Sequence, residues 1–512
     1  MNKFIINSSN QPYMLELYEN LGFKENPFSK FSAEEELSYI NMIYFEPKYF
    51  KTLYDDIKKN NSRFIFGQRG SGKTALMYKI ISKIKEENHL FILIDDFSFL
   101  SKVSTFKDYQ IVFIKQLLKT LVTRTIDNKR LYKDLSDIDK EKFAFIISVF
   151  FETLTNQQFK KVYEFCQTYN KTANILRKIY NNIFNRLINN LLSGVVVLTG
   201  DLVRRSLSLP KTDPEGFYRE YLPTLKESDE LPKNPIEFIN LIPPEQMNHL
   251  FSDVTSIIQK LGFKATIIFI DKVDETSEIK GNVEEISKKL IPLLTENRLI
   301  ISGSFAFVFM LWSKLKPELE SNYVRFDKIK PVDISWTTEE LKSILQKRLK
   351  YFSNDKEIIF ENLIEDNRKT EIILSLAYGS PRDLLMVLSS IYDAQQDINS
   401  DSKFLSDVAT TRGIKKFLES YPFYTIYPPT KTGKEDIKRI IAKLVNLGRL
   451  QFQITDVASS LKIGPPAATS YVKIWKNYGI IKEIPEATGQ AKSYLIDDPK
   501  IEYMVKEKIH VD

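Results

Sequence analysis

A short segment of this chain, Gly67 to Thr74, has the residue types and spacing needed to bind a triphosphate. Its sequence GQRGSGKT fits the pattern G-x-x-x-x-G-K-[ST], in which backbone N–H groups converge on an anion. Three of the chain's 17 glycines fall here, and glycine allows the left-handed backbone and close phosphate approach that such a loop requires. We expect Lys73 to reach the β- and γ-phosphates and the Thr74 hydroxyl to bind Mg²⁺.

The residues on either side of the loop favour the same interpretation. Arg63 to Phe66 is a short, largely apolar run suited to a buried parallel strand, and Ala75 to Ile81 has the apolar spacing of a helix. Strand, glycine-rich loop and helix is the order of a phosphate-binding loop, and the helix N-terminus adds its dipole to the site. We therefore predict an ATP or GTP site. Its loop residues are Gly67, Gln68, Arg69, Gly70, Ser71, Gly72, Lys73, Thr74 and Ala75.

A second acidic motif could complete the chemistry of this site. The apolar run Ile267 to Ile270 ends in Asp271, which puts a carboxylate at the C-terminal edge of a parallel sheet. We expect Asp271 to hold Mg²⁺ directly or through water. Hydrolysis also needs a carboxylate to orient or deprotonate the attacking water, for which Glu275 is the first choice and Asp274 the second.

The composition of the 512 residues is that of a soluble globular protein, with 43% hydrophobic and 27% charged residues. A net charge of +7 is too weak by itself to indicate nucleic-acid binding. The single cysteine, Cys166, excludes an internal disulfide framework and fits a reducing cytosol. Three histidines far apart offer no zinc-ligand cluster, and the most apolar windows are too short to span a bilayer. We expect a cytoplasmic protein without a membrane partner.

The order of apolar runs predicts an α/β fold with a parallel-sheet P-loop NTPase core. Strands are expected at 89–95, 266–270 and 298–301 and around 323–334, with helices at 106–126, 244–261, 339–352 and 371–391. The expected units are an N-terminal segment near the nucleotide (1–50), the ATPase core (51–126 and 240–335), a mainly helical insertion (127–239), a helical lid (336–430) and a winged-helix domain (431–512). Within the first unit, residues 21–29 are expected either to pack beside the adenine or to form an N-terminal tail that packs on the core.

The C-terminal unit has the pattern of a winged helix-turn-helix. Helices are expected at 435–447, 454–461 and 467–478, followed by a hairpin of 480–484 and 492–496 around 487–489. Residues 434–476 contain eight Lys or Arg against three acidic residues, an excess that suits contact with DNA phosphates. The candidate DNA-binding residues are Thr469, Ser470, Lys473 and Lys476. DNA contact, protein contact or autoinhibition, and a purely structural role all remain open for this unit.

Together these motifs resemble the additive-strand (ASCE) P-loop ATPases of the AAA+/STAND group. The chain is similar to origin-initiator-type ATPases and to prokaryotic STAND-like ATPases with an RGSGKTAL loop, over roughly 20–110 and 240–395. Most AAA+ proteins place the catalytic Glu immediately after the strand-end Asp, where this chain has Lys272. The spacing D-x-x-D-E is more like that of STAND switch ATPases, and it implies slow turnover.

The resemblance also implies further site residues. Ser302 or Ser304, after the strand expected at 298–301, would sense the γ-phosphate. The sequence Gly379-Ser380-Pro381-Arg382 resembles the G-x-P-R element of AAA+ lids, in which Arg382 would contact nucleotide from the lid side. Arg325 and Arg298 are candidates for an arginine finger that reaches a neighbouring subunit of a nucleotide-dependent homo-oligomer.

The function expected from these observations is an ATP-driven switch. ATP would bind between core and lid, and the winged helix would deliver the change to double-stranded DNA or to a partner protein. The alternative is a STAND-like signalling ATPase, for example in anti-phage defence, whose helical insertion senses a trigger or recruits an effector protein. A third, non-enzymatic possibility is a nucleotide-locked scaffold.

Overall fold

The computed structural model describes residues 16–95, 105–127, 244–275, 282–354, 357–427, 436–485 and 491–511, with a few isolated positions between them. Apart from Asp127 and a few isolated positions, the helical insertion expected at 127–239 lies outside the described residues, as does the wing tip expected at 487–489. No helix in the described part of the chain is long and apolar enough to cross a membrane.

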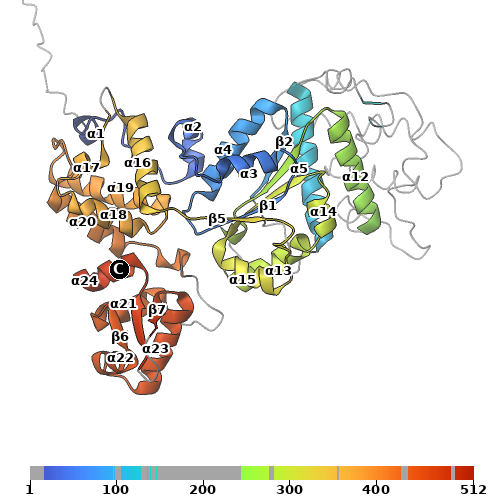
Figure 1. The fold of residues 1–512 in the computed structure, drawn as a ribbon. Coiled ribbons are helices and arrows are strands. Elements are labelled where there is room, and N and C mark those ends of the chain that lie inside the picture. Colours follow the sequence, from blue (N-terminus) through green and yellow to red (C-terminus); the bar gives the residue numbers. More distant parts are fainter. Residues whose placement is uncertain are drawn as a thin grey trace, which may run out of the picture.

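A five-stranded parallel sheet forms the centre of the molecule (Figure 1). The strands are β1 (Arg63–Gly67), β2 (Leu90–Ile94), β3 (Thr266–Ile270), β4 (Ala306–Trp312) and β5 (Pro331–Ile334). Their order is β2-β3-β4-β1-β5, and every pairing is parallel. An additional strand, β4, thus separates the strand before the glycine loop from the strand that ends at Asp271, which is the additive-strand arrangement. The expected α/β class is confirmed.

Helices cover both faces of the sheet because its strands are apolar on both sides. Phe64, Ile268 and Phe309 face one core, and Ile65 and Phe269 face the other, in the alternation that a strand requires. The first core is covered by α5 (Phe106–Asp127), α12 (Pro244–Lys260), α13 (Val283–Leu294) and α15 (Lys316–Ser321). The second is covered by α2 (Ile40–Ile43), α3 (Phe50–Ile57) and α4 (Lys73–Ile84).

The prediction of a strand at 298–301 is wrong. These residues belong to a short helix, α14 (Asn297–Ile301), in which Ile300 is buried while Ile301 is 46% exposed. The strand that follows α13 is β4 instead, and all seven of its residues are buried. A short apolar run does not distinguish a strand from a buried helical turn by its periodicity, which is why the strand was expected at 298–301 instead of at β4. The strand around 323–334 is reduced to β5.

The lid is a helical bundle that begins directly after the sheet. It contains α16 (Thr338–Phe352), α17 (Phe360–Leu363), α18 (Arg368–Ala377), α19 (Pro381–Ile398) and α20 (Asp407–Glu419). The N-terminal segment, with α1 (Leu17–Asn20) and the 3-10 helix η1 (Ala33–Glu36), adds Leu17, Phe23 and Phe28 to the core of this bundle. Residues 21–28 therefore pack in the lid rather than beside the phosphate loop.

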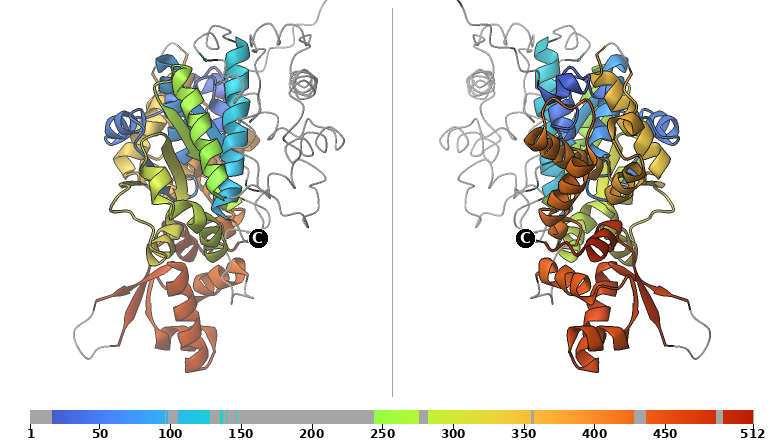
Figure 2. Two further views of the ribbon diagram at one scale, coloured as in Figure 1. Left: turned by 90° about the vertical axis from the view of Figure 1, so that its right-hand side faces the viewer. Right: turned by 90° about the vertical axis from the view of Figure 1, so that its left-hand side faces the viewer.

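The C-terminal unit has the element order of a winged helix. It comprises α21 (Ile437–Leu447), β6 (Gln451–Gln453), α22 (Ile454–Leu461), α23 (Pro465–Tyr478), β7 (Ile481–Ile484), β8 (Ser493–Ile496) and α24 (Pro499–Glu507). The three strands form an antiparallel sheet in the order β6-β8-β7. Figure 2 shows this unit projecting from the remainder of the described chain. Its apolar side chains nevertheless belong to the same continuous core as those of the lid.

One close helix contact in the lid gives a stability prediction. Gly413 in α20 lies so near α19 that a Cβ there would overlap the backbone of Ile391 and lie 2.6 Å from its nitrogen. Because backbone cannot yield as a side chain can, Gly413→Ala should destabilise the protein by about 1–3 kcal/mol or more. Thermal unfolding should show a clear drop in Tm. The neighbouring Arg412→Ala, at a side chain 56% exposed, is the control and should change Tm little. An unchanged Tm for Gly413→Ala would contradict the packing.

Candidate nucleotide-binding site

The glycine loop connects the end of β1 to the start of α4. Gly70 and Gly72 have φ values of +80° and +88°, a left-handed conformation that a residue with a Cβ rarely adopts. Helix α4 begins at Lys73, and its N-cap, Gly72, makes no side-chain cap hydrogen bond. Since the first N–H groups of a helix lack intrahelical acceptors, these donors and the helix dipole are available to an anion.

The polar side chains expected to act on phosphate and Mg²⁺ meet at this loop. The Thr74 hydroxyl donates to Asp271 Oδ2 at 2.9 Å. Lys73 Nζ donates to the carbonyl oxygens of Gly67 and Gln68 at 3.0 and 3.1 Å. Burial raises the pKa of Asp271, against the Thr74 hydrogen bond and the Lys73 charge, which lower it. Burial likewise lowers the pKa of Lys73, although Asp274 and Asp271 oppose this.

These groups fit a triphosphate with Mg²⁺. A hydroxyl and a carboxylate held 2.9 Å apart offer the hard oxygen ligands that Mg²⁺ prefers. A cavity lies over the loop, called the phosphate cavity here, and its lining includes Ser71, Lys73, Thr74 and Asp271. The Ser71 hydroxyl is buried without a hydrogen-bond partner. Buried hydroxyls are normally hydrogen-bonded, so an unpaired one in this loop suits a site in which a bound phosphate completes the pairing.

The two carboxylates considered for catalysis occupy different environments. Asp274 is 8% exposed, and Arg69 binds it through Nε to Oδ2 at 2.8 Å and through Nη2 to its carbonyl at 3.0 Å. Glu275 is the more exposed of the two and also lines the cavity. Burial and then the Asp274 charge raise the pKa of Glu275. Asp274 thus has a structural partner in the loop, which leaves Glu275 as the better candidate for contact with water.

Lys272, which stands where the resemblance places a catalytic Glu, pairs with a carboxylate from the N-terminal segment. Its backbone is left-handed at φ +59°, and its Nζ lies 2.7 Å from Glu34 Oε1. That hydrogen bond raises the pKa of Lys272. Both side chains line the phosphate cavity. Sequence reasoning missed Glu34, because nothing in the run of three glutamates at 34–36 distinguishes it.

The lid reaches the loop through the start of α19. The Arg382 N–H donates to the Gly70 carbonyl at 3.4 Å. A Cβ at Gly70 would overlap Ser380 Oγ and lie 3.1 Å from the Arg382 Cβ. Ser380 itself caps α19 by accepting from the Asp383 N–H at 3.1 Å. The expected lid arginine is therefore brought to the loop, and it lines the same cavity as Lys73.

Two cavities meet over the loop. The phosphate cavity, of about 130 Å³, contains the loop, the acidic residues and Arg382. A second cavity of about 100 Å³ shares Gly72, Ala75 and Pro381 with it and is mostly apolar. Its remaining lining includes Ile40, Tyr44, Phe45, Trp336, Leu345 and Leu384.

Within this second cavity, Trp336 is held in place by its indole N–H, which donates to the Ser71 carbonyl at 2.8 Å. An apolar cavity beside the phosphate cavity suits a planar base. Residues 36–45, rather than 21–29, supply its N-terminal wall.

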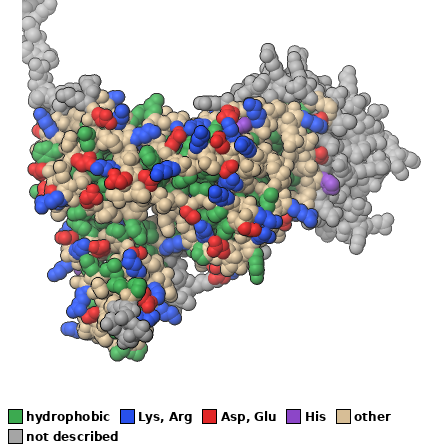
Figure 3. Space-filling view, in the orientation of Figure 1, with side chains coloured by type: hydrophobic (Ala, Val, Ile, Leu, Met, Phe, Trp, Pro, Cys, Tyr) green, Lys and Arg blue, Asp and Glu red, His purple; other side chains and the backbone are tan. Residues whose placement is uncertain are grey.

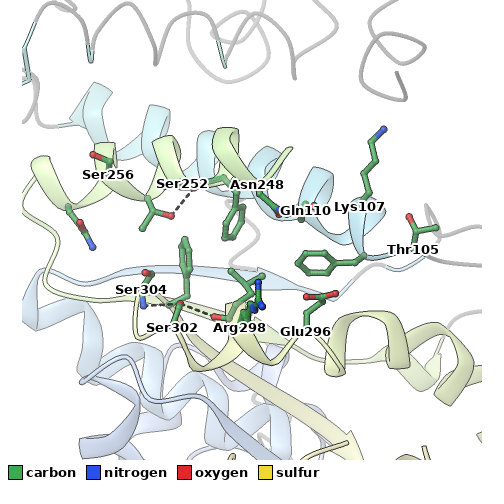
Figure 4. A pocket seen from close by; sticks show the side chains of 16 residues that line it. Thr105, Lys107, Gln110, Asn248, Ser252, Ser256, Glu296, Arg298, Ser302 and Ser304 are labelled. Carbon is green, nitrogen blue, oxygen red and sulfur yellow. Dashed lines mark hydrogen bonds between the residues drawn. The ribbon is translucent and has the colours of Figure 1, made fainter. Parts of the chain in front are cut away.

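The two serines expected as sensors do not lie in this cavity. Ser302 and Ser304 precede β4, so they are at the opposite edge of the parallel sheet from the loop. They line a separate groove of about 810 Å³ with α5, α12 and Arg298 (Figure 4). The C-terminal end of β4 instead brings Trp312 to the loop, where its indole N–H donates to Gln68 Oε1 at 3.1 Å. The two serines were expected to follow a strand at 298–301. These residues form helix α14 instead, and the strand β4 begins only after both serines.

The other candidate residues lie on surfaces. Arg325 pairs with Asp327 at 2.6 Å. On α23, Thr469, Ser470 and Lys473 are exposed, and Lys476 pairs with Glu483 of β7 at 2.6 Å.

Comparisons with known proteins give structural similarity only. No protein-family model and no curated protein match the chain. The Aeropyrum pernix ORC1 protein, solved in complex with DNA, is 10% identical, with 92% of this chain and 96% of that one covered and a TM-score of 0.34. Cdc6p from Pyrobaculum aerophilum is 11% identical, with 96% and 99% covered and a TM-score of 0.30. A Drosophila ORC structure bound to DNA is 10% identical, with 99% and 95% covered and a TM-score of 0.30. At these TM-scores, the fold assignment depends on the chain's own strand order and glycine loop.

Proposed function

We propose that this protein is a Mg²⁺-dependent ATPase that acts as a slow switch, with the winged helix as its DNA-contacting unit. The observation that carries the proposal is the meeting of three elements at one cavity. The loop supplies Lys73 and Thr74, β3 supplies Asp271 at 2.9 Å from the Thr74 hydroxyl, and the lid supplies Arg382. A site composed of core and lid residues responds to its ligand by a change in their relative position.

The side chains that meet at the cavity have distinct roles in this proposal. Lys73 binds β- and γ-phosphate oxygens, and Arg382 binds the same group from the lid. Thr74 and Asp271 hold Mg²⁺, which supplies charge neutralisation to the phosphates when bound. Arg69 remains with Asp274 and fixes the acidic loop against the glycine loop.

Glu275 orients the attacking water and accepts its proton in the proposed hydrolysis. Its raised pKa suits proton transfer near neutral pH better than that of an ordinary carboxylate. Lys272 and its partner Glu34 occupy the position next to Asp271, where the resemblance places a catalytic Glu. With a cation at that position, we expect slow turnover, as suits a switch.

The winged helix supports DNA contact through one exposed helix face. Thr469, Ser470 and Lys473 on α23 are exposed, and no described residue of the ATPase core or lid covers them. Figure 3 shows basic and acidic side chains interspersed over the visible face of the molecule, so no single large field would attract DNA. The proposed contact therefore depends on local lysines, and Lys473 is the central one.

Lys73→Ala should weaken ATP binding by roughly 10- to 100-fold, because a charge-assisted hydrogen bond contributes about 1.5–3 kcal/mol. The affinity can be measured with a fluorescent ATP analogue. Lys83→Ala is the matched control, since Lys83 lies in the same helix but pairs with Glu46 at the surface. Equal affinity in Lys73→Ala and the wild type would refute the nucleotide site.

Glu275→Gln should leave ATP affinity intact and lower the hydrolysis rate by about 10²- to 10⁴-fold, the usual contribution of a general base. The rate of phosphate release measures this. Asp274→Asn tests the second choice, and we expect it to act mainly by loosening Arg69. Normal turnover by Glu275→Gln would mean that the catalytic carboxylate is another residue.

Lys473→Glu should weaken double-stranded DNA binding and reduce the dependence of log affinity on log salt by about one unit, as expected for one lost phosphate contact. Lys415→Glu, at a lid side chain that is 62% exposed, makes the same charge change elsewhere and should bind DNA normally. If the wild type binds no DNA, or if both variants bind equally, the winged helix does not serve as the DNA contact.

A further inference from the structure

A buried ion pair joins the lid to the last helix of the winged-helix unit. Lys500, in the first turn of α24, is 0% exposed, and its Nζ lies 2.8 Å from Asp383 Oδ2. Asp383 is 5% exposed and directly follows Arg382 in the first turn of α19. The same carboxylate oxygen accepts a hydrogen bond from the Tyr421 hydroxyl at 2.7 Å. Because a buried ammonium is costly without its carboxylate, this pair fixes the start of α24 to the start of α19.

A second set of hydrogen bonds joins the same turn of α24 to the segment that leads into the winged helix. Asp498 caps α24 by accepting from the Lys500 N–H at 2.8 Å, and its other oxygen accepts from the Tyr427 hydroxyl at 2.6 Å. The Tyr427 ring packs edge-on against Tyr478, the last residue of α23, with ring centroids 6.2 Å apart. The start of α24 is thus in contact, through one tyrosine, with the end of the exposed helix α23.

The ATPase core also contacts the segment that leads into the winged helix directly, and not only by way of the lid. Lys314, which follows β4, donates from Nζ to the Ile426 carbonyl at 2.6 Å. Its ammonium also lies over the rings of Trp312 and Tyr427, 5.5 and 5.1 Å from their centroids. Burial, and then the nearby Arg69 charge, lowers the pKa of Lys314 to about 8. Trp312 in turn donates to Gln68 of the phosphate loop.

Two continuous routes of contact therefore run from the phosphate loop to the first turn of α24. The first passes through the lid: Gly70, Arg382, Asp383 and Lys500. The second passes through the core: Gln68, Trp312, Lys314, Tyr427 and Asp498. The two routes combine hydrogen bonds, the buried Asp383–Lys500 ion pair and two cation–π contacts, and the buried pair has few alternative arrangements that keep both charges paired.

We propose that the first turn of α24 is the receiver of the nucleotide signal, and that the Asp383–Lys500 pair transmits it from the lid. The proposal rests on the proposed nucleotide site and adds the residues through which that site acts on the winged helix. A phosphate bound by Arg382 would bias the position of α19. Asp383, the next residue, cannot move without Lys500, because separation would leave a buried charge unpaired. The two sites are then coupled by the difference in phosphate contact between the two lid positions.

Hydrogen–deuterium exchange of residues 498–507 tests the coupling without requiring a known partner of the winged helix. With the slowly hydrolysed analogue ATPγS and Mg²⁺, we expect amide exchange in α24 of the full chain to change by about tenfold, within the usual range for coupled sites. In Lys500→Met this response should fall below about twofold, while affinity for a fluorescent ATP analogue stays within about threefold of the wild type. Lys506→Met, in the same helix but at an exposed side chain paired with Glu502, is the matched control and should respond fully.

Tyr427→Phe provides a second variant, which removes one hydroxyl while the Asp498 carboxylate keeps its hydrogen bond from the Lys500 N–H, so it tests the same turn even if Lys500→Met does not fold. We expect it to reduce the α24 response to nucleotide at unchanged nucleotide affinity. Bound ATPγS that leaves α24 exchange unaltered in the wild type, or that changes it as much in both variants as in the wild type, would overturn the proposal. Failure of the wild type to bind ATPγS at all would contradict the proposed function itself, and the fluorescence measurement identifies that case.

Discussion

The close approach of helix α19 to the glycine loop is the contact on which the rest of this structure depends. The Gly70 carbonyl accepts a hydrogen bond from the Arg382 N–H, and a Cβ at Gly70 would overlap the Ser380 side-chain oxygen. The glycine therefore has two tasks, because it also supplies the left-handed turn that the loop needs around phosphate. This contact brings Arg382 into the cavity with Lys73, and it places the first turn of the lid helix where a bound phosphate can act on it.

Three ion pairs around this contact favour one arrangement of the segments that they join. Arg69 pairs with Asp274, Lys272 with Glu34, and Lys500 with Asp383, and each pair joins segments that are distant in sequence. Of the three, the Lys500–Asp383 pair is the most buried, and a buried pair contributes little net stability compared with apolar side chains of the same volume. Its effect is to penalise arrangements in which one partner is lost. The lid and the C-terminal unit share one apolar core, and hydrophobic packing alone tolerates small shifts of one helix over another, so such a constraint matters there.

The sequence predicted the parts of the fold that depend on local patterns. Strand β3 and helix α22 have the expected bounds, and Thr74 meets Asp271 as expected, because the strand–loop–helix motif and the parallel sheet determine that geometry. The position of β4 was not predictable in the same way, since apolar residues before and after Ser302 satisfy either a strand or a helical turn. Contacts between distant segments, such as Lys500 with Asp383, leave no periodic signal in a single sequence.

The most direct test of the account is an experimentally determined structure of the full chain with Mg²⁺ and ATPγS. We expect triphosphate oxygens on the N–H groups of residues 70–75, the Arg382 guanidinium within hydrogen-bond distance of them, and the base between Tyr44 and Trp336. A nucleotide bound elsewhere, or bound in the loop with α19 and Arg382 turned away from it, would contradict the central claim that the lid reads the phosphates.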